Sequence, residues 1–163
     1  MGCRRMGCRE ILVPTDFSEH ADAALDYALE LAEAFGADLI LLHAYHLVIP
    51  MSVPPTGGGF RMPGRVAREL RERAQGAVER LVAAHAGPGR RIRGQAVEAP
   101  PAEAILAEVE RSPVDLIVMG TLGRTGIAQL LLGSVARRIV QTAPCPVLTL
   151  SRRDIRPPSS AES

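Results

Sequence analysis

Three glycines, Gly120, Gly123 and Gly133, have the type and the spacing to bind phosphate. They follow an apolar run of strand character, and Ser134 stands directly before a helical pattern. Glycine lets the backbone come close to a ligand, and a helix N-terminus has unpaired N–H groups and the positive end of the helix dipole. A strand, a glycine-rich loop and a helix start in this order favour an anion site. A tight turn before a capped helix would use the same glycines without a ligand, so the rest of the chain must decide between the two.

The composition excludes one common kind of phosphate site. All 19 basic residues of the chain are arginine, and the sequence contains no lysine. A Walker-type P-loop needs a lysine on the terminal phosphates, so that class is excluded. Enzymes that form a Schiff base with lysine are excluded for the same reason.

Charge and aromatic content argue against a nucleic acid partner, and the length of the apolar runs argues against a membrane span. The net charge is only +1, and aromatic residues make up 3% of the chain, with no tryptophan. A protein that binds nucleic acid needs more basic charge or more stacking rings. No apolar run is long enough for a signal peptide or a transmembrane helix. The chain has only three cysteines, Cys3, Cys8 and Cys145. A disulfide framework normally needs a larger, even number, so this small set favours a reducing compartment, the cytoplasm.

Apolar runs and helical periodicity alternate along the chain. Continuous apolar runs predict buried strands, and a weaker alternation predicts an edge strand. The predicted strands are Glu10 to Pro14, Ala37 to Tyr45, Arg91 to Ala99 (the edge strand), Asp115 to Met119 and Val147 to Leu150. The predicted helices are Glu19 to Phe35, Val66 to Ala86, Ala102 to Arg111 and the segment that follows Gly133 and Ser134. This order predicts an open five-stranded parallel α/β sheet with helices on both faces.

The ends of the first helix and of the domain also have local signals. Ser18 is the expected N-cap of that helix, and Gly36 is expected just after its end, with Phe35 on its apolar face. The predicted domain covers residues 10–150. Residues 1–9 form an N-terminal arm, residues 151–163 a disordered tail, and proline and glycine make residues 46–64 a long irregular connection.

The spacing Gly120-x2-Gly123-x9-Gly133-Ser134 resembles the nucleotide-binding signature of the universal stress protein family, in its ATP-binding branch. Agreement at several separated segments supports this resemblance. They are residues 11–18 (ILVPTDFS), 41–44 (LLHA), 101–105 (PAEAI), 131–136 (LLGSVA) and 143–148 (APCPVL). The resemblance implies a Rossmann-like fold of the adenine nucleotide alpha hydrolase type.

The resemblance also implies which residues bind the nucleotide. The positions expected beside adenine and ribose lie at the ends of the first, second and fourth strands: Pro14, Thr15, Asp16, Ala44, Met119 and Gly120. The positions expected to hold phosphates, through main-chain N–H groups and one hydroxyl, are Gly123, Gly133, Ser134 and Val135, with Arg124 as a possible clamp. All of these lie where open α/β sheets bind ligands, at the carboxyl ends of parallel strands.

Each polar residue also has an ordinary structural explanation. Asp16 can be a turn acid or an N-cap, and Ser134 can cap its helix. Arg124 is as readily a solvated loop charge as a phosphate clamp. His43 is expected to be a core or strand-end histidine and not a ligand or a base.

The function implied by the resemblance is a nucleotide-dependent sensor or regulator in the stress response. It implies ATP, or AMP or ADP, with Mg²⁺, and a homodimer formed through the last strand, Val147 to Leu150. No convincing base or nucleophile surrounds the loop, so no catalytic or metal-binding residue is predicted and hydrolysis should be slow at most. Leu122 and the turn Ala99-Pro100-Pro101 depart from the family pattern, which motivates a nucleotide-independent dimeric adaptor as the alternative. An adenylate hydrolase or transferase would need Asp16 or His43 on the phosphates.

Overall fold

The structure, a computed structural model, describes residues 7–46, 64–121 and 132–151. Strands and helices alternate along these residues, as the sequence predicts. The strands are β1 (Glu10–Pro14), β2 (Asp38–Tyr45), β3 (Ile92–Glu98), β4 (Leu116–Gly120) and β5 (Val147–Leu150). The helices are α1 (Glu19–Phe35), α2 (Gly64–His85), α3 (Pro101–Arg111) and α4 (Ser134–Thr142). Most boundaries differ from the predicted ones by at most two residues.

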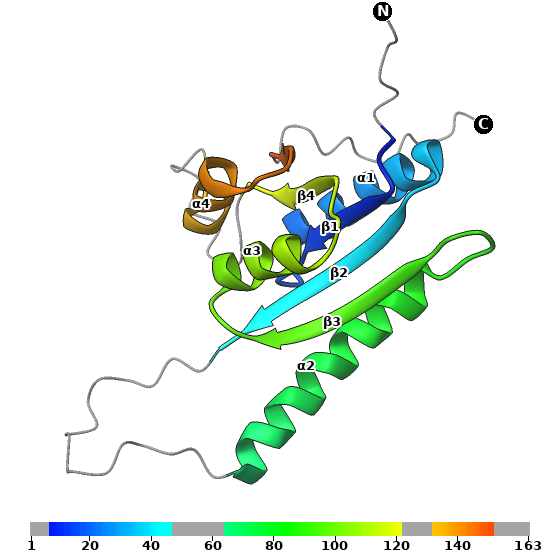
Figure 1. Ribbon diagram of the computed structural model, residues 1–163. Coiled ribbons are helices and arrows are strands. Elements are labelled where there is room, and N and C mark those ends of the chain that lie inside the picture. The colour runs from blue at the N-terminus through cyan, green and yellow to red at the C-terminus, as the bar shows by residue number, and fades with distance from the viewer. Residues whose placement is uncertain (1–6, 47–63, 122–131, 152–163) are drawn as a thin grey trace, which may run out of the picture.

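The five strands form one parallel sheet in the order β3-β2-β1-β4-β5 (Figure 1). α1 and α2 pack on one face of the sheet, in the apolar cluster that holds Leu25 and Val78. α3 and α4 pack on the other face, in the cluster that holds Ile105 and Ile139. The predicted open α/β sheet with helices on both faces is therefore confirmed. The prediction that residues 91–99 contain an edge strand is also confirmed, because β3 ends the sheet.

The central strands are apolar on both faces because helices cover both faces. Consecutive residues of β1 alternate between the two clusters, so that Ile11 and Val13 pack toward α1 while Leu12 packs toward α3 and α4. All three side chains are fully buried. A continuous apolar run is the sequence pattern that such a strand requires.

α1 begins and ends at the predicted caps. The Ser18 hydroxyl accepts a hydrogen bond from the Ala21 N–H at 3.3 Å, and Gly36 adopts the left-handed conformation, with φ of 69°. The prediction for Phe35 was wrong, because its side chain is 53% exposed, whereas Leu29 is buried. The buried face of α1 carries mainly alanines, and helical spacing places Phe35 on that same face, but Phe35 is the last residue of the helix, next to the C-cap Gly36.

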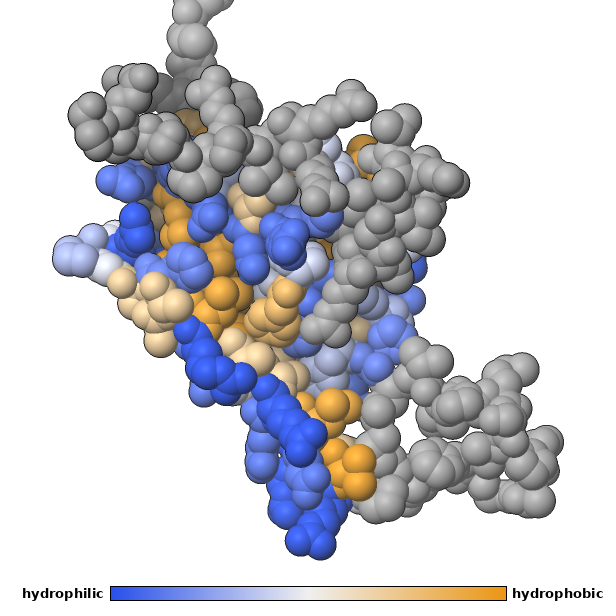
Figure 2. Space-filling model, turned by 180° about the vertical axis from the view of Figure 1, so that it is seen from behind, coloured by the Kyte–Doolittle hydropathy of each residue, from blue (hydrophilic) through white to orange (hydrophobic). Residues whose placement is uncertain are grey.

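α2 is the longest helix and has a charged outer face. Ala74 and Val78 are its buried residues. On its exposed side Arg65 pairs with Glu69 and Arg68 with Glu72, the members of each pair being four residues apart. Figure 2 shows the projecting end of this helix as mainly hydrophilic. Within the described ranges, none of the helices combines the length and the apolar character needed to cross a membrane.

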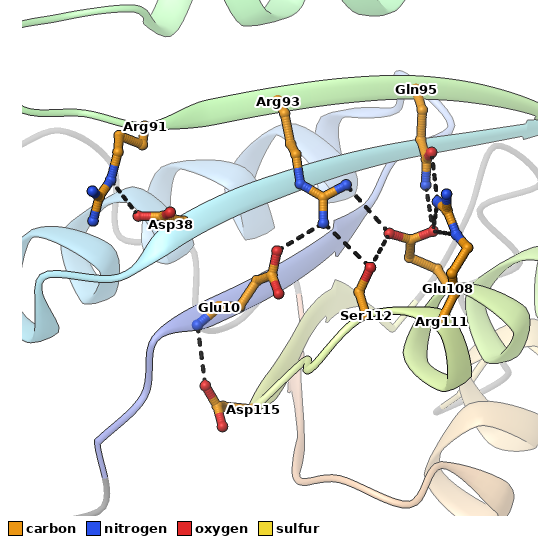
Figure 3. Close-up of polar contacts among 9 residues, drawn as sticks. All are labelled: Glu10, Asp38, Arg91, Arg93, Gln95, Glu108, Arg111, Ser112 and Asp115. Carbon is orange, nitrogen blue, oxygen red and sulfur yellow. Dashed lines mark hydrogen bonds and ion pairs between the residues drawn. The ribbon is translucent and has the colours of Figure 1, made fainter.

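A buried carboxylate, that of Glu108, joins α3 to the edge of the sheet (Figure 3). The Glu108 side chain is 3% exposed. It accepts hydrogen bonds from Gln95 Nε2 at 2.6 Å and Ser112 Oγ at 3.0 Å, and from the guanidinium groups of Arg111 and Arg93. Arg93 also reaches Glu10 of β1, at 2.7 Å. The network thus connects β1, β3 and α3.

We expect this network to make stability fall in acid. Burial alone would raise the pKa of Glu108, but the hydrogen bonds from Arg111, Gln95 and Ser112 outweigh it and hold that pKa below the ordinary 4.5. A folded-state pKa below the unfolded one adds stability above the unfolded pKa, and this stability is lost as pH falls through the folded pKa. Glu108→Gln should lower the free energy of unfolding by about 1–2 kcal/mol at pH 7.

Denaturant unfolding between pH 7 and pH 3 measures both effects. The difference between the wild type and Glu108→Gln should shrink below about pH 4.5 as the wild-type carboxylate takes up its proton. A constant difference over that range would contradict the assigned role of the Glu108 charge.

Candidate functional site

A pocket of about 210 Å³ opens at the carboxyl ends of the central strands. The chain runs from β1 outward to β2 and β3, then crosses back to β4 and β5 on the other side of β1. The crevice between β1 and β4 is therefore the point where the strand order reverses, and open α/β sheets bind ligands there. Residues from both strand ends line the pocket, among them Pro14 and Met119.

Nine of the eleven residues predicted to bind a nucleotide line this pocket. They are Pro14, Thr15, Asp16, Ala44, Met119, Gly120, Gly133, Ser134 and Val135. The other two, Gly123 and Arg124, lie outside the described residues, as does Leu122. The structure thus brings the predicted residues together, and their contact with a nucleotide stays a prediction.

Six further residues of the pocket wall are not among the predicted site residues. They are Ala21, Leu42, Pro101, Ile105, Thr121 and Ala136. Most are small or apolar residues whose sequence pattern indicates a core position, so nothing local distinguishes them from other core residues. Position is the one available signal, since Thr121 lies two residues after the predicted strand end at Met119.

α4 directs its N-terminus at the pocket. Its first hydrogen bond is from the Arg137 N–H to the Gly133 carbonyl, at 2.9 Å. Helix geometry leaves the amides of Ser134, Val135 and Ala136 without a partner within the helix, and all three residues line the pocket. Gly133 is the N-cap and Ser134 the first helical residue, so the alternative explanation of Ser134 as a helix cap does not hold. Amides and a hydroxyl at this position suit a phosphate.

Thr121, directly after β4, is buried and has two long-range backbone hydrogen bonds. Its N–H donates to the Leu150 carbonyl at 2.9 Å, and its carbonyl accepts from the Gly133 N–H at 2.7 Å. These two hydrogen bonds fix the end of β4, the end of β5 and the start of α4 relative to one another. Thr121 therefore sets the position of the α4 amides beside the strand ends.

Gly120 lets α1 come close to β4. A Cβ atom at this position would lie 3.0 Å from both the Cβ and the carbonyl oxygen of His20. Glycine is thus required here for close approach. The contact brings the N-terminus of α1, with Ala21, to the pocket. Because Pro101 also lines the pocket, the N-terminal turns of three helices meet there, and their dipoles favour an anionic ligand.

The turn from β1 to α1 forms the remaining wall. The Thr15 N–H donates to the Leu42 carbonyl at 2.9 Å, and the Thr15 hydroxyl accepts from the Phe17 N–H at 3.0 Å. Asp16 Oδ1 accepts from the Ser18 N–H at 3.1 Å. Asp16 is therefore a turn acid, as its ordinary explanation says, and it also lines the pocket. These hydrogen bonds position the Asp16 carboxylate beside a largely apolar part of the pocket wall.

The sheet order, the crevice at the strand reversal and the helix N-termini around it define an open α/β protein of Rossmann-like type. The model of the universal stress protein family matches residues 7–151. The universal stress protein MJ0531 of Methanocaldococcus jannaschii is 33% identical over 144 residues, which cover 88% of this chain and 82% of that protein. This chain belongs to the universal stress protein family.

Solved structures agree with this assignment. The protein MJ0577 of M. jannaschii superposes with a TM-score of 0.73 at 30% identity, over 90% of this chain and 97% of that one. A universal stress protein solved in complex with cAMP superposes with a TM-score of 0.58 at 26% identity, over 89% of this chain and 98% of that one. The second structure shows that a relative of this fold binds an adenine nucleotide.

Proposed function

We propose that this chain binds an adenine nucleotide, ATP in the first place, in the pocket between β1 and β4. The observation that carries the proposal is the contrast between the two sides of the pocket. One side is apolar, with Pro14, Ala44 and Met119, and suits an adenine ring. The other side presents the first-turn amides of α4 and suits phosphate groups. The cAMP complex of a relative is consistent with this arrangement.

Within the proposal, Thr15, Asp16 and Gly120 contact the ribose side, while Gly133, Ser134 and Val135 hold phosphates. The proposal also includes Gly123 and Arg124, which lie outside the described residues. Mg²⁺ accompanies the triphosphate, because a divalent cation offsets its charge. ADP and AMP use the same amides with fewer phosphate contacts.

The biological role we propose is that of a cytoplasmic sensor or regulator in the stress response, with hydrolysis that is slow at most. His43 is not among the residues that line the pocket, and the Asp16 carboxylate accepts a hydrogen bond from its own turn. The proposal therefore gives neither side chain the role of a general base on the phosphates. The sparse cysteine set supports the compartment.

Calorimetric titration of the purified protein with ATP, ADP and AMP, in the presence of Mg²⁺, tests the proposal. We expect dissociation constants in the range of about 1–100 μM, and mass spectrometry of the native protein should find a co-purified adenine nucleotide. A protein that binds none of the three and carries no nucleotide would instead be the nucleotide-independent adaptor.

We also propose a homodimer formed through β5. Among the described strands, β5 pairs only with β4, so one edge of β5 has no neighbour in the sheet. An edge with apolar residues gains from pairing with a second copy. Light scattering should give twice the 17.4 kDa mass of one chain, and a monomer mass would contradict the proposal.

A further inference from the structure

The turn between β1 and α1 contains a strained residue. Phe17 has a φ of 58°, and it is the one non-glycine residue with positive φ in the described parts of the chain. A non-glycine residue in the left-handed region costs about 1–2 kcal/mol and persists only where its surroundings hold it there. Thr15 and Asp16, which line the pocket, lie directly before it.

His43 makes a long-range side-chain contact with this turn. Its Nδ1 lies 2.9 Å from the Thr15 carbonyl oxygen. A carbonyl oxygen only accepts, so His43 carries a proton on Nδ1 and donates it. The His43 ring also packs on the Phe17 ring, with centroids 4.5 Å apart. One side chain from β2 thus contacts the turn on both sides of Asp16.

His43 acts from the face of the sheet opposite the pocket wall. Its neighbours Leu42 and Ala44 line the pocket, whereas His43 does not. Side chains alternate along a strand, so His43 points to the α1 side, where Leu39, Leu41 and Phe17 also pack. A ligand in the pocket therefore does not meet the imidazole.

We infer that His43 is a positioning residue for the nucleotide site. Its Nδ1–H and its ring hold the turn at residues 15–18 in the strained conformation, and this fixes Thr15 and Asp16 toward the pocket. The inference rests on the proposed function for its consequence in binding. The effect on the turn itself does not depend on any ligand.

Two substitutions separate the hydrogen bond from the packing. His43→Leu removes the donor but keeps an apolar side chain against Phe17. His43→Asn places an amide N–H close to the position of Nδ1 and so rescues the hydrogen bond. His43→Gln, one methylene longer, lacks a donor at that position and replaces the leucine variant if the latter does not fold.

Hydrogen exchange without nucleotide is the first measurement. His43→Leu should speed exchange of the Phe17 and Ser18 amides about tenfold or more, while the Ile40 amide in β2 keeps its protection. His43→Asn should stay within about threefold of the wild type. Unchanged exchange in His43→Leu, or equal loss of protection in both variants, would overturn the inference even if the protein bound no nucleotide.

ATP affinity is the second measurement. His43→Leu should weaken ATP binding about tenfold, because part of the binding free energy is then used to order the turn. His43→Asn should restore most of the affinity. Thermal stability should differ little between the two variants. Equal ATP affinity in the wild type and His43→Leu, in a protein that does bind ATP, would show that the turn does not position the ligand.

Discussion

Replacing Ser134 by glutamate is expected to weaken ATP binding about 100-fold without loss of stability. The change places a negative charge on the first residue of α4, where phosphates are proposed to bind. Two like charges about 4 Å apart cost about 4 kcal/mol at an effective dielectric constant of about 20. Because Ser134 is exposed, solvent screening reduces this cost. The expected 100-fold loss of affinity corresponds to about 2.8 kcal/mol. The same charge interacts favourably with the helix dipole, by about 0.3–1 kcal/mol.

Calorimetry and denaturant unfolding of the same preparations measure the two opposite effects. Ser134→Ala is the matched control and should lose only one hydroxyl contact, with affinity lowered by about tenfold or less. Adenosine, which has no phosphate, should bind Ser134→Glu about as well as the wild type. An unchanged ATP affinity in Ser134→Glu would show that phosphates do not occupy the α4 N-terminus.

Replacing Gly94 by alanine is expected to cost about 3 kcal/mol of stability. Gly94 lies in β3 beneath α2, and a Cβ atom there would fall 2.4 Å from Val78 Cγ1 and 2.7 Å from Val82 Cγ2. Val78 is fully buried, so it cannot move aside without repacking the helix on the sheet. Glycine at this position allows α2 to approach β3.

Urea unfolding of four variants, Gly94→Ala, Val78→Ala, the double variant and Gly76→Ala, tests this packing. In the double variant Gly94→Ala with Val78→Ala the main clash is absent. Its loss of unfolding free energy should therefore be smaller than the sum of the losses in the two single variants, by about 1 kcal/mol or more. Gly76→Ala is the control on α2 itself, because its Cβ would meet only Arg80 Nη1 at an ordinary 3.5 Å. That change should stabilise the helix by about 0.5–1 kcal/mol. A Gly94→Ala variant as stable as the wild type would mean that α2 does not pack as described.

The nucleotide proposal and the packing of α2 concern separate parts of the molecule. The pocket lies at the carboxyl ends of β1 and β4, whereas α2 covers β2 and β3. Gly94→Ala should therefore lower stability without changing the affinity of the fraction that remains folded. Ser134→Glu should do the reverse, so the two variants together separate ligand binding from folding.

The sequence by itself determined the elements, their order and the class of fold. Apolar runs such as Leu39 to Leu42 predict buried strands because both faces of a central parallel strand are covered. Ser18 and Gly36 mark the ends of α1 because capping and the left-handed conformation are local backbone properties. Alternation of such strands with helices leaves few arrangements other than an open parallel sheet.

Much of the pocket wall was also predictable, because residues at the carboxyl ends of neighbouring parallel strands must converge. Pro14, Ala44 and Met119 are examples, and all three line the pocket. The residues that sequence reasoning missed, such as Ile105, contribute an apolar surface that any buried helix residue could offer. Their place in the wall depends on how α3 lies across the sheet.

Only the tertiary structure decided which side chains act on one another across the chain. The hydrogen bond from His43 to Thr15 joins residues 28 positions apart, and Thr121 holds the start of α4 through Gly133. The partners of the Glu108 carboxylate come from both β3 and α3. The periodicity of a sequence indicates which residues are buried and whether a segment is a helix or a strand. It does not record which buried groups meet, because that depends on strand order and on the approach of helices to the sheet.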